Sequence, residues 1–170
     1  MIPMETQATL FLLCGKIASG KSTLAASLAS KHDALIMAED EWLSQLYDNK
    51  SLDDYIQTST KLRTTLEPLI IRMLARGINV VLDFQANTVR SRTWLKGLIT
   101  KSGTRHELHY LDVPNEVCKA RLKIRNVSGQ HPYDVDEKTF EIFTSHFLAP
   151  QASEGFYVIL HAHPYISMPP

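Results

Sequence analysis

The feature that most restricts the fold of this chain is a glycine-rich turn near its amino terminus. Residues 15–22 read Gly-Lys-Ile-Ala-Ser-Gly-Lys-Ser. An apolar run, 8–14, precedes them and is typical of a buried strand, whereas 23–30 carries Leu24 and Leu28 at helical spacing. Glycine lets the backbone pass close to an anion, and the amides at the start of a helix attract negative charge. This strand–turn–helix arrangement predicts a phosphate-binding loop.

Each residue of this loop has an expected role in binding ATP and Mg²⁺. The side chain of Lys21 would reach the β- and γ-phosphates, and the hydroxyl of Ser22 would hold Mg²⁺. A turn that only joins a strand to a helix is the alternative, but such a turn needs neither the lysine nor the hydroxyl. The expected nucleotide-binding residues are Gly15, Lys16, Ile17, Ala18, Ser19, Gly20, Lys21, Ser22 and Thr23.

Length and composition restrict the remaining possibilities. The 170 residues favour one domain over 1–170 with a core of its own. Lys plus Arg and Asp plus Glu both total 18, and this balance argues against a general binder of nucleic acid or membrane surfaces. No apolar run is long enough to span a membrane, and the amino terminus does not resemble a signal peptide. The two cysteines, Cys14 and Cys118, are expected to be buried free thiols, which predicts a cytoplasmic location.

Strand-like and helix-like segments alternate along the chain. This alternation predicts an α/β fold, in which helices cover both faces of a parallel sheet. Pro68 lies inside the longest helical segment and is expected to kink it or to start a second helix. Further strands are expected at 34–38, 78–83, 106–112 and 156–161, and helices at 41–47, 52–76, 88–100, 115–125 and 136–147.

Two acidic segments follow predicted strands and would meet the loop at one edge of the sheet. Asp83 ends the run Val-Val-Leu-Asp and is expected to support Mg²⁺, although a helix or loop cap is the alternative. In Glu39-Asp40-Glu41, a carboxylate could accept the proton of a hydroxyl that attacks the γ-phosphate. The same three acids could instead form a solvated face, with Asp40 as the N-cap of the next helix.

Several other polar residues are candidates for the site. Arg121 and Arg125 lie four residues apart on one helix face, before a predicted loop at 126–133, where they could neutralise a bound triphosphate. The segment after Asp83 would overhang the site. Its candidates for substrate contact are Gln85, Asn87, Arg90 and Arg92.

These motifs together resemble the P-loop kinases, which include AAA-type ATP-binding kinases. The chain is most similar to the group of zeta toxins, chloramphenicol phosphotransferase, gluconate kinase and the kinase domain of polynucleotide kinase. The resemblance rests on residues 15–22, the Asp40 region, 80–83, and the run 111–114 that leads into Arg121 and Arg125.

The resemblance implies a P-loop NTPase three-layer sandwich with sheet order 2-3-1-4-5. It also implies a helical substrate-binding segment at about 41–76 and a lid at about 126–135. Asp40 would be the general base, Arg121 would pack near the adenine, and Arg125 would address phosphate. Many relatives carry an arginine shortly after the catalytic aspartate, whereas here Trp42 stands in that region and offers an apolar surface to a neutral or amphipathic acceptor.

The sequence therefore predicts a Mg·ATP-dependent kinase that phosphorylates a hydroxyl group of a small molecule. Lys21, Asp40, Arg121 and Arg125 are the expected catalytic residues. Two alternatives stay open. One is a toxin-like, nucleotide or nucleic-acid-end kinase on the same fold, which the charge balance disfavours; the other is an ATP-binding switch that transfers nothing.

Overall fold

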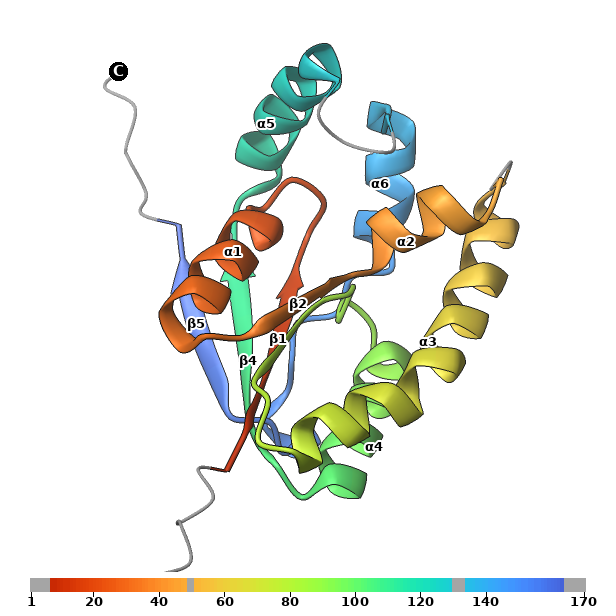
Figure 1. Cartoon of the computed structure of the whole chain (residues 1–170). Coiled ribbons are helices and arrows are strands. Elements are labelled where there is room, and N and C mark those ends of the chain that lie inside the picture. Colours follow the sequence, from red (N-terminus) through yellow and green to blue (C-terminus); the bar gives the residue numbers. More distant parts are fainter. Residues whose placement is uncertain (1–6, 49–50, 130–133, 164–170) are drawn as a thin grey trace, which may run out of the picture.

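The computed structural model describes residues 7–48, 51–129 and 134–163, and these build an α/β sandwich (Figure 1). The strands are β1 (Thr9–Gly15), β2 (Leu35–Ala38), β3 (Val80–Asp83), β4 (Arg105–Asp112) and β5 (Val158–Ala162). The helices are α1 (Lys21–His32), α2 (Glu39–Leu46), α3 (Leu52–Ala75), α4 (Val89–Ser102), α5 (Asn115–Ser128) and α6 (Glu137–Ser145), with a short 3₁₀ turn at Ala152–Glu154.

All five strands are parallel, and their order is β2-β3-β1-β4-β5. The predicted fold class and the order 2-3-1-4-5 are therefore confirmed, and the protein has the P-loop NTPase fold. Because the strands are parallel, their carboxyl ends meet at one edge of the sheet. The turn that follows β1, the start of α2 and the segment that follows β3 all lie at this edge (Figure 1).

Alternation along the central strands divides the core between the two faces of the sheet. In β1, Leu10 and Leu12 pack on the face covered by α3 and α4, whereas Phe11 and Leu13 pack with Ala25 of α1 on the other face. Successive side chains of a strand point to opposite faces, so one apolar run serves both layers. Both cysteines are buried free thiols as expected, and burial raises the pKa of Cys14 to about 11.

The helix boundaries are displaced by a few residues from the sequence prediction, and α2, α3 and α5 differ from it in further ways. α3 continues through Pro68 as one helix. α5 extends to Ser128, so that 126–128, predicted as loop, are helical. The rest of that predicted lid loop lies partly outside the described residues. α2 begins at Glu39 with Ala38 as its N-cap, so Asp40 lies in the first turn of the helix and does not cap it. Within the described residues no helix is both long and apolar enough to cross a membrane.

Candidate active site

The turn between β1 and α1 is tightly wound. Ala18 and Gly20 have positive φ angles of 60° and 104°, a conformation that glycine adopts without strain. A Cβ atom on Gly15 would lie 2.6 Å from the Oγ of Ser19 and 3.2 Å from the carbonyl oxygen of Leu111. The backbone here therefore leaves no room for a side chain, as expected of a loop that wraps closely around an anion.

Three side chains join this loop to the rest of the site, two from other elements and one, Lys16, from the loop itself. The Oδ1 atom of Asn87 accepts a hydrogen bond of 3.0 Å from the backbone N–H of Gly15. Lys16 donates from Nζ to the carbonyl oxygen of Val113 at 3.1 Å, and Arg121 donates from Nη1 to that of Ser19 at 3.1 Å. Asn87, predicted as a substrate contact, thus supports the loop instead. The predicted role of Arg121 beside adenine stays a prediction.

Lys21 lies at the centre of the loop. Its Nζ atom donates hydrogen bonds to the carbonyl oxygens of Gly15, at 2.8 Å, and Lys16, at 2.9 Å. Burial lowers the pKa of the Lys21 ammonium, while the nearby carboxylates of Asp83 and Asp40 act in the opposite direction. The loop lysine and the two predicted carboxylates are therefore brought together, although they come from three separate parts of the chain.

A cavity of about 670 Å³ opens beside the loop at the carboxyl edge of the sheet. Residues that were not predicted as part of the site also line it, among them Glu39, Glu41, Tyr55, Phe143 and Asp134. The predicted site residues that line the cavity are Ile17, Ala18, Gly20, Lys21, Ser22, Thr23, Asp40, Asp83, Gln85 and Arg125. A volume of this size suits a small-molecule ligand or cofactor.

The donor set fits Mg²⁺ held together with a nucleotide. Ser22 and Asp83 line the cavity on the same side as the loop, and Mg²⁺ binds through one or two protein oxygens together with phosphates and water. Among the described residues, no group of three or more His, Cys, Asp and Glu side chains forms a metal cage. Ser22 and Asp83 are thus the residues that would hold the ion.

Arg125 reaches into the cavity from α5. Its Nε and Nη2 atoms are buried and have no hydrogen-bond partner among the described residues. Burial lowers the pKa of the guanidinium group, and the charges of Asp40 and Asp134 partly oppose this effect. Buried donors without a partner are rare and costly in proteins. The arrangement fits an anionic ligand that would accept hydrogen bonds from both nitrogens.

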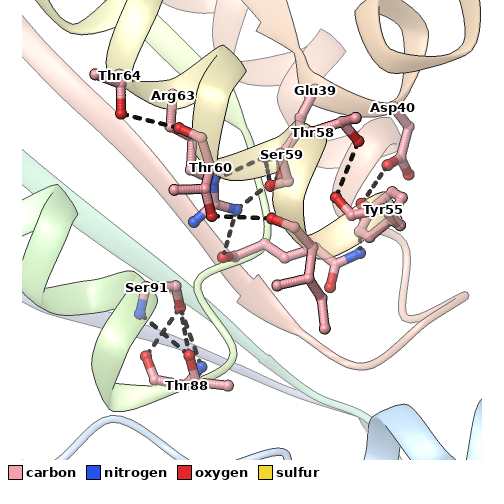
Figure 2. A network of polar contacts seen from close by, with 12 residues as sticks. Glu39, Asp40, Tyr55, Thr58, Ser59, Thr60, Arg63, Thr64, Thr88 and Ser91 are labelled. Atoms are coloured by element: carbon pink, nitrogen blue, oxygen red, sulfur yellow. Dashed lines mark hydrogen bonds and ion pairs between the residues drawn. The ribbon is translucent and has the colours of Figure 1, made fainter. Parts of the chain in front are cut away.

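The first two of the three acidic residues at the start of α2 have different partners on α3 (Figure 2). Glu39, 2 % exposed, accepts a hydrogen bond from the hydroxyl of Ser59. It also accepts two from Arg63, from Nε at 2.7 Å and from Nη2 at 2.8 Å. Asp40 accepts one of 2.7 Å at Oδ1 from the hydroxyl of Tyr55. Both carboxylates line the cavity, but Glu39 is held in an ion pair with Arg63, whereas Asp40 is the one that acts on the pKa of Lys21.

Sequence reasoning did not identify Tyr55 as part of the site, nor Arg63 as the partner of Glu39. Both residues lie on α3, at 15 and 24 positions from their respective partners. A helical pattern indicates which face of α3 is apolar, but it does not indicate which side chains of neighbouring elements α3 meets. The acidic run Glu39-Asp40 was the only available signal, since a buried carboxylate requires a partner.

Three predicted substrate residues are placed elsewhere. Trp42 packs against the hydrophobic core on the α3 side and does not line the cavity. Arg90 is exposed and does not line it either. Arg92 is fully buried, pairs with Glu154 at 2.7 Å, and donates to the carbonyl oxygens of Ala86 and Leu148. Trp42 and Arg92 thus take part in the packing of the fold, and Arg90 lies on the surface.

Comparison with known proteins agrees with this fold. Residues 10–150 match the family model described as an AAA domain. Two Protein KTI12 homologs, from Oryza sativa subsp. indica and subsp. japonica, are each 30 % identical over 146 residues. The alignment covers 83 % of this chain and 48 % of each relative, so the chain spans about half the length of the curated relatives it matches.

Solved structures with the same fold include kinases. A presumed kinase of Chloroflexus aurantiacus has a TM-score of 0.72 at 16 % identity and covers 94 % of this chain and 86 % of its own. Kti12 of Chaetomium thermophilum, crystallised with ADP-AlF3, has a TM-score of 0.68 at 16 % identity, with coverage of 90 % and 88 %. A sugar kinase of a Janibacter species has a TM-score of 0.65 at 15 % identity, with coverage of 91 % and 85 %.

At these identities, structural similarity establishes the fold alone. The family assignment rests on the match over residues 10–150, which includes the phosphate-binding loop, Asp40, Asp83 and Arg125. The chain therefore belongs to the AAA-domain family and has the nucleotide-binding, kinase-like P-loop fold that its motifs resemble.

Proposed function

We propose that this protein is a Mg·ATP-dependent kinase that transfers the γ-phosphate of ATP to a hydroxyl group of a small molecule. The position of Asp40 carries this proposal. Its carboxylate lines the same cavity as Lys21, Ser22 and Asp83, and it lies close enough to Lys21 to oppose the lowering of the lysine pKa. A protein that only bound nucleotide would need the loop but would not need a carboxylate at the acceptor side.

The residues of the chain divide the work of phosphoryl transfer between them. Lys21 and the buried donors of Arg125 would stabilise the negative charge on the phosphoryl oxygens. Ser22 and Asp83 would hold Mg²⁺, which supplies charge neutralisation between the phosphates when bound. Asp40 would accept the proton of the acceptor hydroxyl as the new P–O bond forms. Asp134, which precedes α6, and Phe143, which lies within it, would help to exclude water from the reacting atoms.

The comparisons support this assignment without naming the acceptor. Structures described as a sugar kinase and as a gluconokinase share the fold, and both names refer to small hydroxylated acceptors. Kti12 of Chaetomium thermophilum was crystallised with ADP-AlF3, which supports nucleotide binding by this fold. The proposed substrates are therefore ATP and a small-molecule acceptor, with Mg²⁺ as the metal ion.

The test is a screen for transfer of labelled γ-phosphate from Mg·ATP to pooled sugars, nucleosides, amino acids and hydroxylated antibiotics. Lys21→Ala is expected to abolish ATP binding and turnover. Asp40→Asn should bind ATP like the wild type but lose about 10²- to 10⁴-fold in kcat, the usual contribution of a general base. Glu116→Gln, an exposed carboxylate in the first turn of α5, is the matched control.

Three results would contradict the proposal. Normal turnover in Asp40→Asn would remove the base assignment. A labelled oligonucleotide, with no labelled small molecule, would indicate the nucleic-acid-end kinase. ATP binding with slow hydrolysis that no acceptor changes would indicate the nucleotide-dependent switch.

A further inference from the structure

Tyr55 connects the proposed base to two other parts of the cavity wall. Its hydroxyl donates a hydrogen bond of 2.7 Å to Oδ1 of Asp40, and the Nε2 atom of Gln85 donates to the Tyr55 hydroxyl oxygen at 3.3 Å. All three residues line the cavity, and they come from α3, α2 and the segment after β3. Figure 2 shows the phenol ring of Tyr55 beside the carboxylate of Asp40.

The Tyr55 hydroxyl is a permanent donor in this contact. Burial raises the pKa of the phenol well above its usual value, and the charges of Asp40 and Glu39 raise it further. The phenol therefore keeps its proton throughout the neutral and mildly alkaline range. Asp40 receives its hydrogen bond at every pH at which a kinase would work.

The helix that carries Tyr55 is itself anchored to α2. Ser59, one helical turn beyond Tyr55, and Arg63, a further turn along, both bind the carboxylate of Glu39. Arg63 also donates to the carbonyl oxygen of Gln85 at 3.3 Å and lies over the rings of Phe84 and Trp94. One face of α3 thus holds both adjacent carboxylates of α2, which leaves Tyr55 little freedom to move relative to Asp40.

We propose that Tyr55 is a positioning residue that orients the carboxylate of Asp40 and keeps it ionised for proton acceptance. This inference rests on the proposed function. A hydrogen bond to Oδ1 fixes the plane of the carboxylate and hence the direction of Oδ2. A hydrogen bond donated to a carboxylate also stabilises its ionised form, the only form that accepts a proton from the acceptor.

The first test measures the effect of Tyr55 on the ionisation of Asp40 and does not require an acceptor. The carboxyl ¹³C shift of Asp40 is titrated with pH in the free protein, with Asp40→Asn as the assignment control, for the wild type and for Tyr55→Phe. The midpoint should rise by about one pH unit when the hydroxyl is removed, since a hydrogen bond to a charged group has about that effect. An unchanged midpoint would overturn the inference.

The other charged groups around Asp40 are the same in the wild type and in Tyr55→Phe. They are Lys21 and Asp83 at the phosphate loop, Glu39 with its partner Arg63, Glu41 in α2, Arg125 in α5, and Asp134 before α6. The difference between the two titration midpoints therefore reports the effect of the Tyr55 hydroxyl alone.

The second test measures turnover of the acceptor found in the screen. Tyr55→Phe should lower kcat about ten- to hundredfold, move the acidic limb of the kcat profile to higher pH, and leave the KM for ATP unchanged. In the Asp40→Asn background the same substitution should have no further effect, because Tyr55 acts through Asp40. Tyr110→Phe is the matched control, since the Tyr110 hydroxyl also donates to a carboxylate, that of Asp112 at 3.3 Å, but outside the cavity.

Two kinetic results would overturn the inference: a Tyr55→Phe profile that matches Tyr110→Phe, or an equal loss in the Asp40→Asn background. Thermal unfolding of each variant excludes a simple loss of fold. If the wild type transfers phosphate to no acceptor, the proposed function is wrong, and the titration alone decides whether Tyr55 controls the ionisation of Asp40.

Discussion

Replacement of Arg92 by methionine tests whether this residue stabilises the fold, as the structure indicates, or contacts substrate, as the sequence predicted. Arg92 is 0 % exposed, and its Nε and Nη2 atoms bind the carboxylate of Glu154 at 2.7 Å and 3.0 Å. Its Nη1 atom donates hydrogen bonds to the carbonyl oxygens of Ala86 and Leu148, at 2.9 Å and 2.7 Å. The pair joins α4 to the segment before β5.

The expected loss of stability follows from the polar groups that lose their partner in Arg92→Met. Methionine fills much of the volume but leaves the carboxylate of Glu154 and two carbonyl oxygens without their donor. Removal of one partner of a buried ion pair costs about 3–5 kcal/mol. In a protein of this size, each kcal/mol lowers Tm by about 2–4 °C, so Tm is expected to fall by roughly 6–20 °C.

Thermal and urea unfolding measure this effect, with Arg90→Met as the matched control. Arg90 is exposed on the same helix, so its replacement should change stability by less than about 0.5 kcal/mol. The pH dependence gives a second measurement. Arg92 lowers the pKa of Glu154 below its ordinary 4.5, so the pair stabilises the fold above that pH and this contribution is lost as the pH falls through the lower folded value.

In Arg92→Met this contribution is absent at every pH, so the free energy of unfolding should fall less steeply on acidification than in the wild type. The reasoning is refuted if Arg92→Met and Arg90→Met unfold within about 1 °C of each other, or if Arg92→Met keeps wild-type stability but raises the KM for the acceptor.

Three further substitutions test the site. Asn87→Ala removes the acceptor for the Gly15 amide and should weaken ATP binding about fivefold in calorimetry, the effect of one hydrogen bond; an unchanged Kd would contradict the bracing role. Gly15→Ala should prevent ATP binding because its Cβ would meet Leu111 and Ser19, whereas Gly97→Ala, with open space around its Cβ, should not; normal binding by Gly15→Ala would show that the loop adapts. Trp42→Ala should lower the free energy of unfolding by about 2 kcal/mol and leave the acceptor KM unchanged; a raised KM at wild-type stability would restore the predicted substrate contact.

Much of the fold could be predicted from the chain because the relevant signals are local. Each apolar run that was expected as a strand is a strand, with boundaries displaced by a few residues at most. The spacing of Leu62, Leu66, Leu69, Met73 and Leu74 indicated a long helix. Leu62, Leu66 and Leu74 are buried and Met73 is partly buried, whereas Leu69 is 47 % exposed. Pro68 does not start a second helix, because a helix packed against a core can tolerate one missing hydrogen bond; the kink stays a prediction.

The charged residues were predicted less well, because pairing depends on distance in space. Arg90 and Arg92 are two residues apart in sequence, yet one is exposed and the other fully buried. Glu39 and Asp40 are adjacent and both line the cavity, yet Glu39 binds Arg63 and Asp40 accepts a hydrogen bond from Tyr55. Helical geometry turns neighbouring side chains by about 100°, so the orientation of a helix decides which residue of a polar run meets the site.

The sequence by itself determined the phosphate-binding loop, since a strand, two glycines, a lysine and a hydroxyl within eight residues need only local backbone geometry to form it. It also determined the parallel sheet, through the alternation of apolar strands with amphipathic helices. Only the tertiary structure decided that Glu39 is neutralised by Arg63 while Tyr55 holds Asp40, and that Asn87 supports the loop. These assignments depend on burial, and a buried charge or amide keeps the partner that packing brings within reach, whatever its distance along the chain.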